Sequence, residues 1–375
     1  MLKGIHLTLL IGPGVPLPAP KLLVDALDSI QVTNSKERSG FQISFKVGKN
    51  SPILTTMLPA GFFEPIVTRV VVMVTLNGLP NVLMDGLVSN QELGPSNEAG
   101  KSTFTITGED LSLAMDLIQK VLPYPGMPKV AQVNLALAPY LALGVVPVVV
   151  PPPVISIKSP TSGWSSQTKM TDRAFVKGLA SQAGYIFVVQ PGPLPGQSIA
   201  YFGPDISLPI PQPALSINLD SHTNVENLSF SLDGQAKKIR VMTIYDPITQ
   251  KVPIPIPVPN INAFKPPMGA RPPIPKKLEF DSESARFAPD EAAEKILGAL
   301  MNNPPSITAS GSLNVLEYRG ILRARMLVGV RGGGLAYDGM YYVDSVTHNI
   351  KKGEYKQSFN LSRDGLISNT PLVIV

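Results

Sequence analysis

The residues best suited to chemistry are few and stand apart in the sequence. The histidines are His6, His222 and His348, and none of them lies in a pattern typical of metal ligands. The chain has no cysteine, which excludes disulfides, thiolate catalysis and cysteine zinc sites. We therefore predict that the histidines are structural and that the chain carries neither a metal nor another cofactor.

Acidic and nucleophilic residues also lack a catalytic pattern. No serine nucleophile elbow and no paired-carboxylate motif is present in the sequence. Asp205, Asp220 and Glu226 are dispersed acids that would serve a hydrolase only if the fold brought them together. The sequence predicts no catalytic residues and no enzyme, and a hydrolase acting on peptidoglycan or another substrate is the alternative.

Basic residues next to glycines or in β-type segments are candidates for binding. The RGGGL sequence at 331–335 resembles an anion-binding nest, but it lacks the lysine and the strand-to-helix context of a phosphate loop, so we predict a hairpin turn. Arg323 and Arg325 are predicted on one strand face. There they would line a tube lumen, pair with acids at a subunit seam, or remain ordinary solvated charges.

The segment 34–40 is the most charged part of the first third of the chain. It contains Lys36, Glu37 and Arg38. A solvated hairpin tip is one interpretation, and a contact to a neighbouring subunit is the other. Lys356, on the polar side of a predicted strand with Ser358 and Asn360, is a further candidate for an interface or a channel.

Composition limits the class of partner. Hydrophobic residues make up 44% of the 375 residues and charged residues only 16%, so we expect other subunits to cover much of the surface. The net charge of +5 is spread without a basic block, so no nucleic-acid contact is predicted beyond passage through a lumen. The apolar stretch 130–155 contains five prolines, which predicts a bent buried or intersubunit segment and no stable membrane insertion.

The elements that must position these residues are mostly strands. Residues 1–122 predict a small barrel or sandwich with a tight turn at Asn77 and Gly78 and a closing helix that carries Leu111, Met115 and Ile118 and stops at Pro123. Its strands are expected at 5–11, 22–33, 41–47, 67–76, 82–90 and 102–107.

The second half of the chain begins with a different pattern. A helix capped at Thr171 and ended by Gly184, followed by a hairpin, is expected over 168–202. Residues 252–275 predict an extended proline arm, and 289–301 predict a helix. Further strands are expected at 214–219, 225–232, 238–245, 306–313, 320–330, 339–350 and 354–362.

Together these patterns predict a mainly β fold with α+β modules. The expected units are a first β-domain, a small barrel or sandwich, at 1–122 and a proline-rich connector with the helix-hairpin module at 123–206. A second antiparallel β-domain is expected from 207–250 and 305–368, with the proline-rich arm and helix of 251–304 inserted into it.

Three stretches resemble the phage late-control gene D family. They are TDRAFVKGLASQAGYIFVVQPGPLPGQSIAYFGP, SINLDSHTNVENLSFSLD and VDSVTHNIKKGEYKQSFNLSRDGL. The match is specific over 168–233 and 306–368 and only architectural over 1–122. Such proteins are similar to the baseplate hub of contractile phage tails and to the N-terminal part of type VI secretion spike proteins.

The resemblance implies a structural role. Two tube-like barrels per chain imply a homotrimer with pseudo-six-fold symmetry that joins a hexameric inner tube protein to a trimeric spike. It also implies contacts with other baseplate proteins, and assembly in the bacterial cytoplasm as part of a virion tail or contractile injection particle. Only DGLISNTPLVIV follows Arg363, so the spike is expected to be a separate protein. Reversing the charge of Arg38 or Arg325 is expected to impair assembly without unfolding the chain. A secreted β-rich binding protein is a second alternative.

Overall fold

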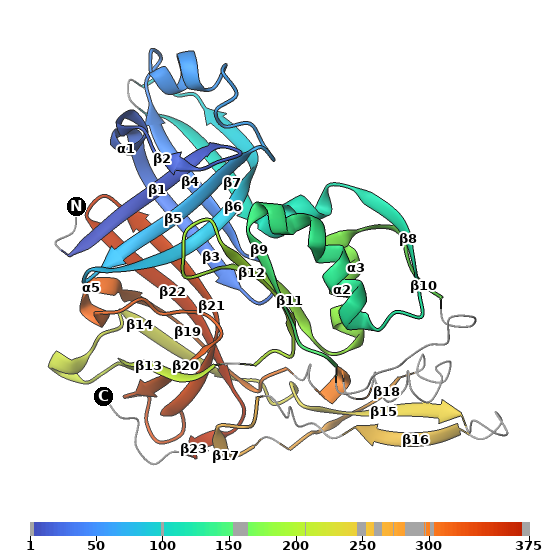
Figure 1. The fold of residues 1–375 in the computed structure, drawn as a ribbon. Helices are drawn as coiled ribbons and strands as arrows, with labels where there is room; N and C mark the ends of the chain where they lie inside the picture. The colour runs from blue at the N-terminus through green and yellow to red at the C-terminus, as the bar shows by residue number, and fades with distance from the viewer. Residues whose placement is uncertain are drawn as a thin grey trace.

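The structure is a computed structural model, and it confirms the mainly β fold. It describes residues 4–98, 101–152, 164–206, 208–245, 253–258, 265–272, 274–281, 296, 298–300 and 304–369. The largest element is one sheet of 13 strands (Figure 1). Its members are β1 (Ile5–Pro13), β2 (Leu17–Pro18), β3 (Leu27–Ser35), β4 (Gly40–Val47), β5 (Thr68–Leu76), β6 (Leu79–Gly94), β7 (Ser102–Asp110), β13 (Leu208–Ser216), β14 (Asn227–Leu232), β19 (Ile307–Asn314), β20 (Met326–Arg331), β21 (Gly339–Lys351) and β22 (Glu354–Arg363).

The early and late strands of the chain are joined in this sheet. Its order is β14-β19-β22-β21-β3-β4-β7-β6-β5-β1-β2, and β20 and β13 continue from β21 as a branch. The junction is the antiparallel pair β21 and β3, whose register runs from Ser345 opposite Ser35 to Lys351 opposite Ser29. The pairs among the described residues form an open path, so the expected two tube-like units share one sheet.

Alternation along the strands explains why both halves share a core. Ile30 and Val32 of β3, Val346 of β21 and Phe359 of β22 point to the same side and are buried in one hydrophobic cluster with Phe45. Burying a side chain of this size stabilises the fold by about 1.5–3 kcal/mol. The two halves therefore fold onto a single apolar layer.

A second, smaller core belongs to the helix-hairpin module. Its elements are η2 (Leu111–Asp116), β8 (Gln119–Pro125), α2 (Lys129–Leu137), η3 (Ala138–Leu143), β9 (Val145–Val149), β10 (Trp164–Thr171), α3 (Asp172–Gln182), β11 (Ile186–Pro191) and β12 (Ser198–Gly203). The predicted cap is confirmed, because the Thr171 side chain accepts a hydrogen bond from the Ala174 N–H. The predicted hairpin is β11 paired with β12, and β9 adds to it in parallel.

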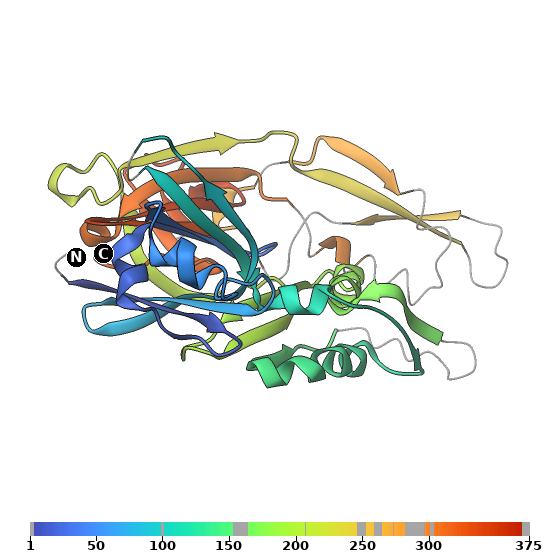
Figure 2. The same ribbon diagram turned by 90° about the horizontal axis from the view of Figure 1, so that it is seen from above.

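The remaining strands lie outside the two cores. They are β15 (Lys238–Tyr245), β16 (Pro253–Val258), β17 (Gly269–Arg271), β18 (Lys277–Asp281) and β23 (Leu366–Ser368). Figure 2 shows that the β15–β16–β18 sheet projects from the end of the large sheet at which the β8–β10 ribbon also projects. The predicted helix at 289–301 lies mostly outside the described residues, although 296 and 298–300 are helical.

Several predicted elements were wrong. Residues 22–26 of the expected strand at 22–33 lie in α1 (Lys21–Ala26), and the strand begins at Leu27. The expected helix after Thr107 is the short 3-10 helix η2, because 107–110 still pair with β4 and β6. Ile118 is 67% exposed beyond η2, and Pro123 lies inside β8. The short helices α5 (Val315–Tyr318), η1 (Ile53–Met57) and η4 (Asp220–His222) were not predicted.

Other local predictions hold. The Asn77-Gly78 turn joins β5 to β6, and both residues have positive φ, as a tight hairpin requires. The stretch 130–155 contains α2, η3 and β9 within its described part. The helices of the described residues are all too short or too polar to cross a membrane.

Candidate functional site: an uncharged polar face and an adjacent cavity

One face of the large sheet carries rows of small polar side chains. Directly opposed residues of neighbouring strands project to the same face, so the register defines each row. One row across β14, β19, β22, β21 and β3 consists of Asn227, Ser312, Ser358, Thr347 and Thr33. The next row continues into the first half of the chain, through Asn314, Lys356, Asn349, Gln31, Gln42 and Thr107.

Side chains on this polar face hydrogen-bond to one another across the strands. The contacts connect five pairs of neighbouring side chains: Asn227 with Ser312 (2.8 Å), Ser229 with Ser310 (3.0 Å), Asn360 with Ser345 (2.9 Å), Thr33 with Thr347 (3.2 Å) and Ser44 with Thr105 (3.1 Å). Each contact uses donors and acceptors that would otherwise be offered to a ligand. The polar face is therefore hydrophilic, yet much of its hydrogen-bonding capacity is already used.

Two lysines of the polar face are paired within the chain, whereas the exposed Glu92 and Lys351 take part in none of the ion pairs of the described residues. Lys356 contacts Glu226 at 2.7 Å and Glu354 at 3.2 Å, and the hydrogen bonds to these two acids raise the pKa of Lys356. Lys46 contacts Asp28 at 2.8 Å. The face thus presents little unbalanced charge.

The charged segment 34–40 is the tip that connects β3 to β4, and it docks on the helix-hairpin module. Arg38 pairs with Glu109, whose other oxygen contacts Arg173 of α3 at 3.0 Å. Burial alone would raise the pKa of Glu109, but the hydrogen bonds from both arginines lower it overall. Lys36 lies 3.9 Å from Asp205. The Arg38 side chain still remains 69% exposed, at the edge of the polar face.

Glu37 takes part in the same docking through its backbone. Its carbonyl oxygen accepts a hydrogen bond from the Lys177 ammonium group of α3 at 3.3 Å. The Glu37 side chain is exposed. The tip is therefore held at several points and still presents charged side chains to the outside.

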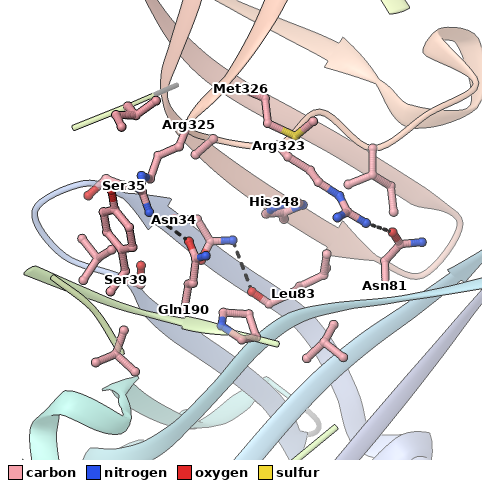
Figure 3. A pocket seen from close by; sticks show the side chains of 18 residues that line it. Asn34, Ser35, Ser39, Asn81, Leu83, Gln190, Arg323, Arg325, Met326 and His348 are labelled. Carbon is pink, nitrogen blue, oxygen red and sulfur yellow. Dashed lines mark hydrogen bonds between the residues drawn. The ribbon is translucent and has the colours of Figure 1, made fainter. Parts of the chain in front are cut away.

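Arg323 and Arg325 do not share a strand face, because β20 begins only at Met326. Both line a cavity of about 400 Å³ at the junction of β3, β6, β11 and the segment before β20 (Figure 3). The Arg325 guanidinium lies 4.6 Å from the centre of the Tyr201 ring, and its Nη1 donates to Gln190 at 3.3 Å. Arg323 is exposed and donates to Asn81. Arg325 is thus largely enclosed by its own chain.

Two glutamine side chains form hydrogen bonds with the backbone of the segment just before β20, in the way that a neighbouring strand would. The Gln357 amide accepts from the Leu322 N–H and donates to the Leu322 carbonyl, each at 2.9 Å. The Gln212 amide pairs in the same way with Arg323, at 2.7 and 3.0 Å. The pairing with Gln357 satisfies backbone groups of Leu322 that would otherwise be buried without a partner, whereas the contacts of Gln212 with Arg323 are exposed.

His348 lies beside the contact between Gln357 and Leu322, and its side chain is buried. Its Nδ1 lies 2.7 Å from the Tyr355 hydroxyl and 3.3 Å from Gln357 Nε2. Because Gln357 Nε2 only donates, Nδ1 accepts and the ring proton resides on Nε2. Burial, with a contribution from Arg323, lowers the pKa of His348 to about 3. The ring is neutral at physiological pH, as a structural role predicts.

The dispersed acids do not form a pair within the described part of the chain. Asp205 contacts Lys265 at 2.8 Å, Glu226 contacts Lys356, and Asp220 is exposed in η4. No group of three or more histidine and acidic side chains that could hold a metal ion is found among the described residues. The RGGGL segment is confirmed as the turn between β20 and β21, where Gly333 N–H donates to Asp338 at 2.7 Å.

Known proteins resemble this chain in their fold. No family model and no curated protein matches the sequence. A tail protein from Neisseria meningitidis superposes with a TM-score of 0.60 at 13% identity, covering 96% of this chain and 97% of that one. The 43 kDa tail protein of prophage MuSo2 from Shewanella oneidensis gives 0.61 at 13% identity, with 96% and 98% covered.

A third similar structure comes from a secretion system. It is an Escherichia coli protein described as a component of the type VI secretion system with structural similarity to the T4 bacteriophage tail proteins gp27 and gp5. Its TM-score is 0.52 at 10% identity, and the match covers 93% of this chain and 77% of that one. The chain therefore shares its fold, over nearly its whole length, with these two tail proteins and with this component of a type VI secretion system.

Proposed function

We propose that this protein is the structural baseplate hub of a contractile tail or contractile injection system. Three copies would form a ring in which the two strand groups of each chain, at 1–122 and at 207–250 with 305–368, give pseudo-six-fold symmetry. One end would bind a hexameric inner tube protein, and the other end would bind a separate trimeric spike, with other baseplate proteins around the ring. Assembly would take place in the bacterial cytoplasm.

The observation that carries this proposal is the shared sheet. The antiparallel pair β3 and β21 joins both strand groups side by side, and the polar face runs across the junction without interruption. A ring of three such chains would repeat this face three times around one axis, and its two strand groups would together give six similar segments. The fold shared with phage tail proteins supports the same role.

We further propose that the polar face lines the central channel. Many of its hydroxyl and amide groups bond to one another, and its Lys46 and Lys356 are paired with acids, so a moving polymer would find few groups to bind. The exposed charges at the tip of the β3–β4 hairpin, Lys36, Glu37 and Arg38, lie at the edge of that face and would contact a neighbouring subunit or the tube.

The mass of the purified chain in solution tests the hub directly. Native mass spectrometry at micromolar concentration is expected to give three times the chain mass of 40.1 kDa. Imaging of the particle is then expected to place three copies at the junction of tube and spike. A stable monomer, or density for six copies at that junction, would contradict the proposal.

A muralytic assay on the same preparation distinguishes the hub from the alternative hydrolase. Asp205 and Glu226 are each paired with a lysine, so no turnover is expected from them. Turnover that is lost in Asp205→Asn or Glu226→Gln, with the trimer intact, would show an activity that the hub alone does not explain.

A further inference from the structure

The cavity at the junction contains two arginines that form no direct ion pair among the described residues. Its charged lining residues are Arg323 and Arg325, and no aspartate or glutamate of the described part of the chain lines it. The nearby Asp205 acts on Arg325 through space, but it contacts Lys265 and Lys36. The ion pairs formed by the described residues include neither arginine. Their described side-chain partners are the neutral groups of Asn81, Gln190 and Tyr201.

Several features of Arg325 are energetically unfavourable. A buried guanidinium without a carboxylate loses hydration that neutral partners only partly replace. Its φ of +63° lies in the left-handed region, which is unfavourable for a residue with a side chain. Its Nε is shielded from solvent and has no hydrogen-bond acceptor among the described residues. Strain and unmet bonding at one residue are typical of a binding site.

Apolar side chains form much of the rest of the cavity wall, next to the polar Asn34, Ser35 and Ser39. They are Val82, Leu83, Val188, Ile206, Ile321 and Met326. His348 also lines the cavity, but it is neutral and adds no charge. The cavity therefore combines cationic donors with apolar surface.

We propose that this cavity binds a carboxylate attached to an apolar body of about the size of one amino-acid residue. The carboxylate would form the direct ion pair that Arg325 lacks among the described residues, with Arg323 adding positive potential from the other side of His348 (Figure 3). The apolar body would contact the aliphatic walls. The carboxylate belongs either to a free small acid or to the C-terminal residue of a peptide.

Inorganic phosphate fits the cavity less well. Phosphate sites generally offer several convergent N–H groups or a bidentate arginine. In Figure 3 the two guanidinium groups point apart, Arg325 towards Gln190 and Arg323 towards Asn81. Phosphate would also leave the aliphatic walls in contact with water.

Calorimetric titration of the full chain tests the ligand class with four probes: hexanoate, hexanamide, N-acetyl-leucine and inorganic phosphate. Both carboxylates are expected to bind, and hexanamide at least about tenfold more weakly than hexanoate, because the charged hydrogen bond is lost. Tighter binding of N-acetyl-leucine would identify a peptide terminus as the source, and tighter binding of hexanoate a free acid. Equal binding of hexanamide and hexanoate, or binding of phosphate alone, would overturn the proposal.

Variants locate the site. Arg325→Gln is expected to weaken hexanoate binding about tenfold or more. Because that substitution removes a buried group, Arg323→Gln and Ala324→Leu provide independent tests, the first by removing an exposed charge and the second by filling the cavity. Arg271→Gln, on exposed β17, removes the same charge elsewhere and is expected to leave affinity unchanged. Unchanged affinity in both Arg323→Gln and Ala324→Leu would refute the site.

Discussion

At the scale of single residues, His348 has the largest consequence for pH. It is neutral and buried in the folded chain, with a pKa lowered to about 3, whereas an exposed histidine in the unfolded chain titrates near 6.5. Between these values the unfolded state binds more protons than the folded state. The free energy of unfolding must therefore fall as the pH falls below about 6.5.

We predict that replacing His348 by glutamine removes this pH dependence. Between pH 7 and pH 5 the native chain should lose about 2 kcal/mol more stability than His348→Gln does, at about 1.4 kcal/mol per pH unit below 6.5. Urea unfolding at the two pH values measures the difference. Burial raises the pKa of Asp110 and Asp344, which acts in the opposite direction, but it does so in both proteins and cancels.

His222 provides the matched control for this experiment. It lies exposed on the short helix η4, so its replacement removes no buried contact. His222→Gln should retain the full pH dependence. If His348→Gln and His222→Gln respond alike, the burial of His348 does not control acid stability.

At the scale of elements, the segment before β20 depends on side chains for its backbone partners. Gln357→Leu would leave the N–H and the carbonyl of Leu322 buried and unpaired, at about 1–3 kcal/mol for each group. We predict a total loss of roughly 2–5 kcal/mol in the free energy of unfolding. Hydrogen exchange at the Leu322 amide should accelerate in parallel.

Gln212→Leu is the control for the Gln357→Leu substitution. Its contacts with Arg323 are exposed, so water replaces them and the loss should stay below about 1 kcal/mol. Comparable losses in the two variants would mean that the Gln357 contacts contribute no more than the exposed ones.

This segment also shows why sequence reasoning failed here. The residues 320–330 have the composition of a strand, but only those from Met326 onward pair as one, and Leu322 and Arg323 bond instead to glutamine side chains 35 and 111 residues away in sequence. A strand predicted over these residues places Arg323 and Arg325 on one strand face, which is wrong because the strand begins at Met326. By contrast, the module around α3 was predictable, because its cap at Thr171 and its turn at Gly184 are local signals.

The polar face could be anticipated only in part. The alternation of Ser345, Thr347 and Asn349 and of Lys356, Ser358 and Asn360 is visible in the sequence. That these strands continue into β3 depends on a contact between residues about three hundred positions apart, and no local pattern contains it. The extent of the face, and not its existence, required the structure.

At the scale of the whole molecule, the proposed channel predicts that added charge on the polar face affects delivery and not assembly. Ser358 and Asn360 are exposed on β22, and surface substitutions of this kind usually change stability by no more than about 0.5 kcal/mol. Ser358→Lys with Asn360→Lys should therefore leave the trimer intact. In a ring of three chains the added lysines would face one lumen and bind a passing polyanion.

Particles that carry this double variant are expected to assemble in normal numbers and to deliver several-fold less efficiently. The control, Asn50→Lys with Asn97→Lys, adds the same charge at exposed loop positions outside the polar face. Delivery would be counted per intact particle, so that assembly and transit are measured separately. Because electrostatic retention weakens as salt rises, high ionic strength should partly restore delivery in the double variant alone. Normal delivery by the double variant at low salt would show that the polar face does not line the channel.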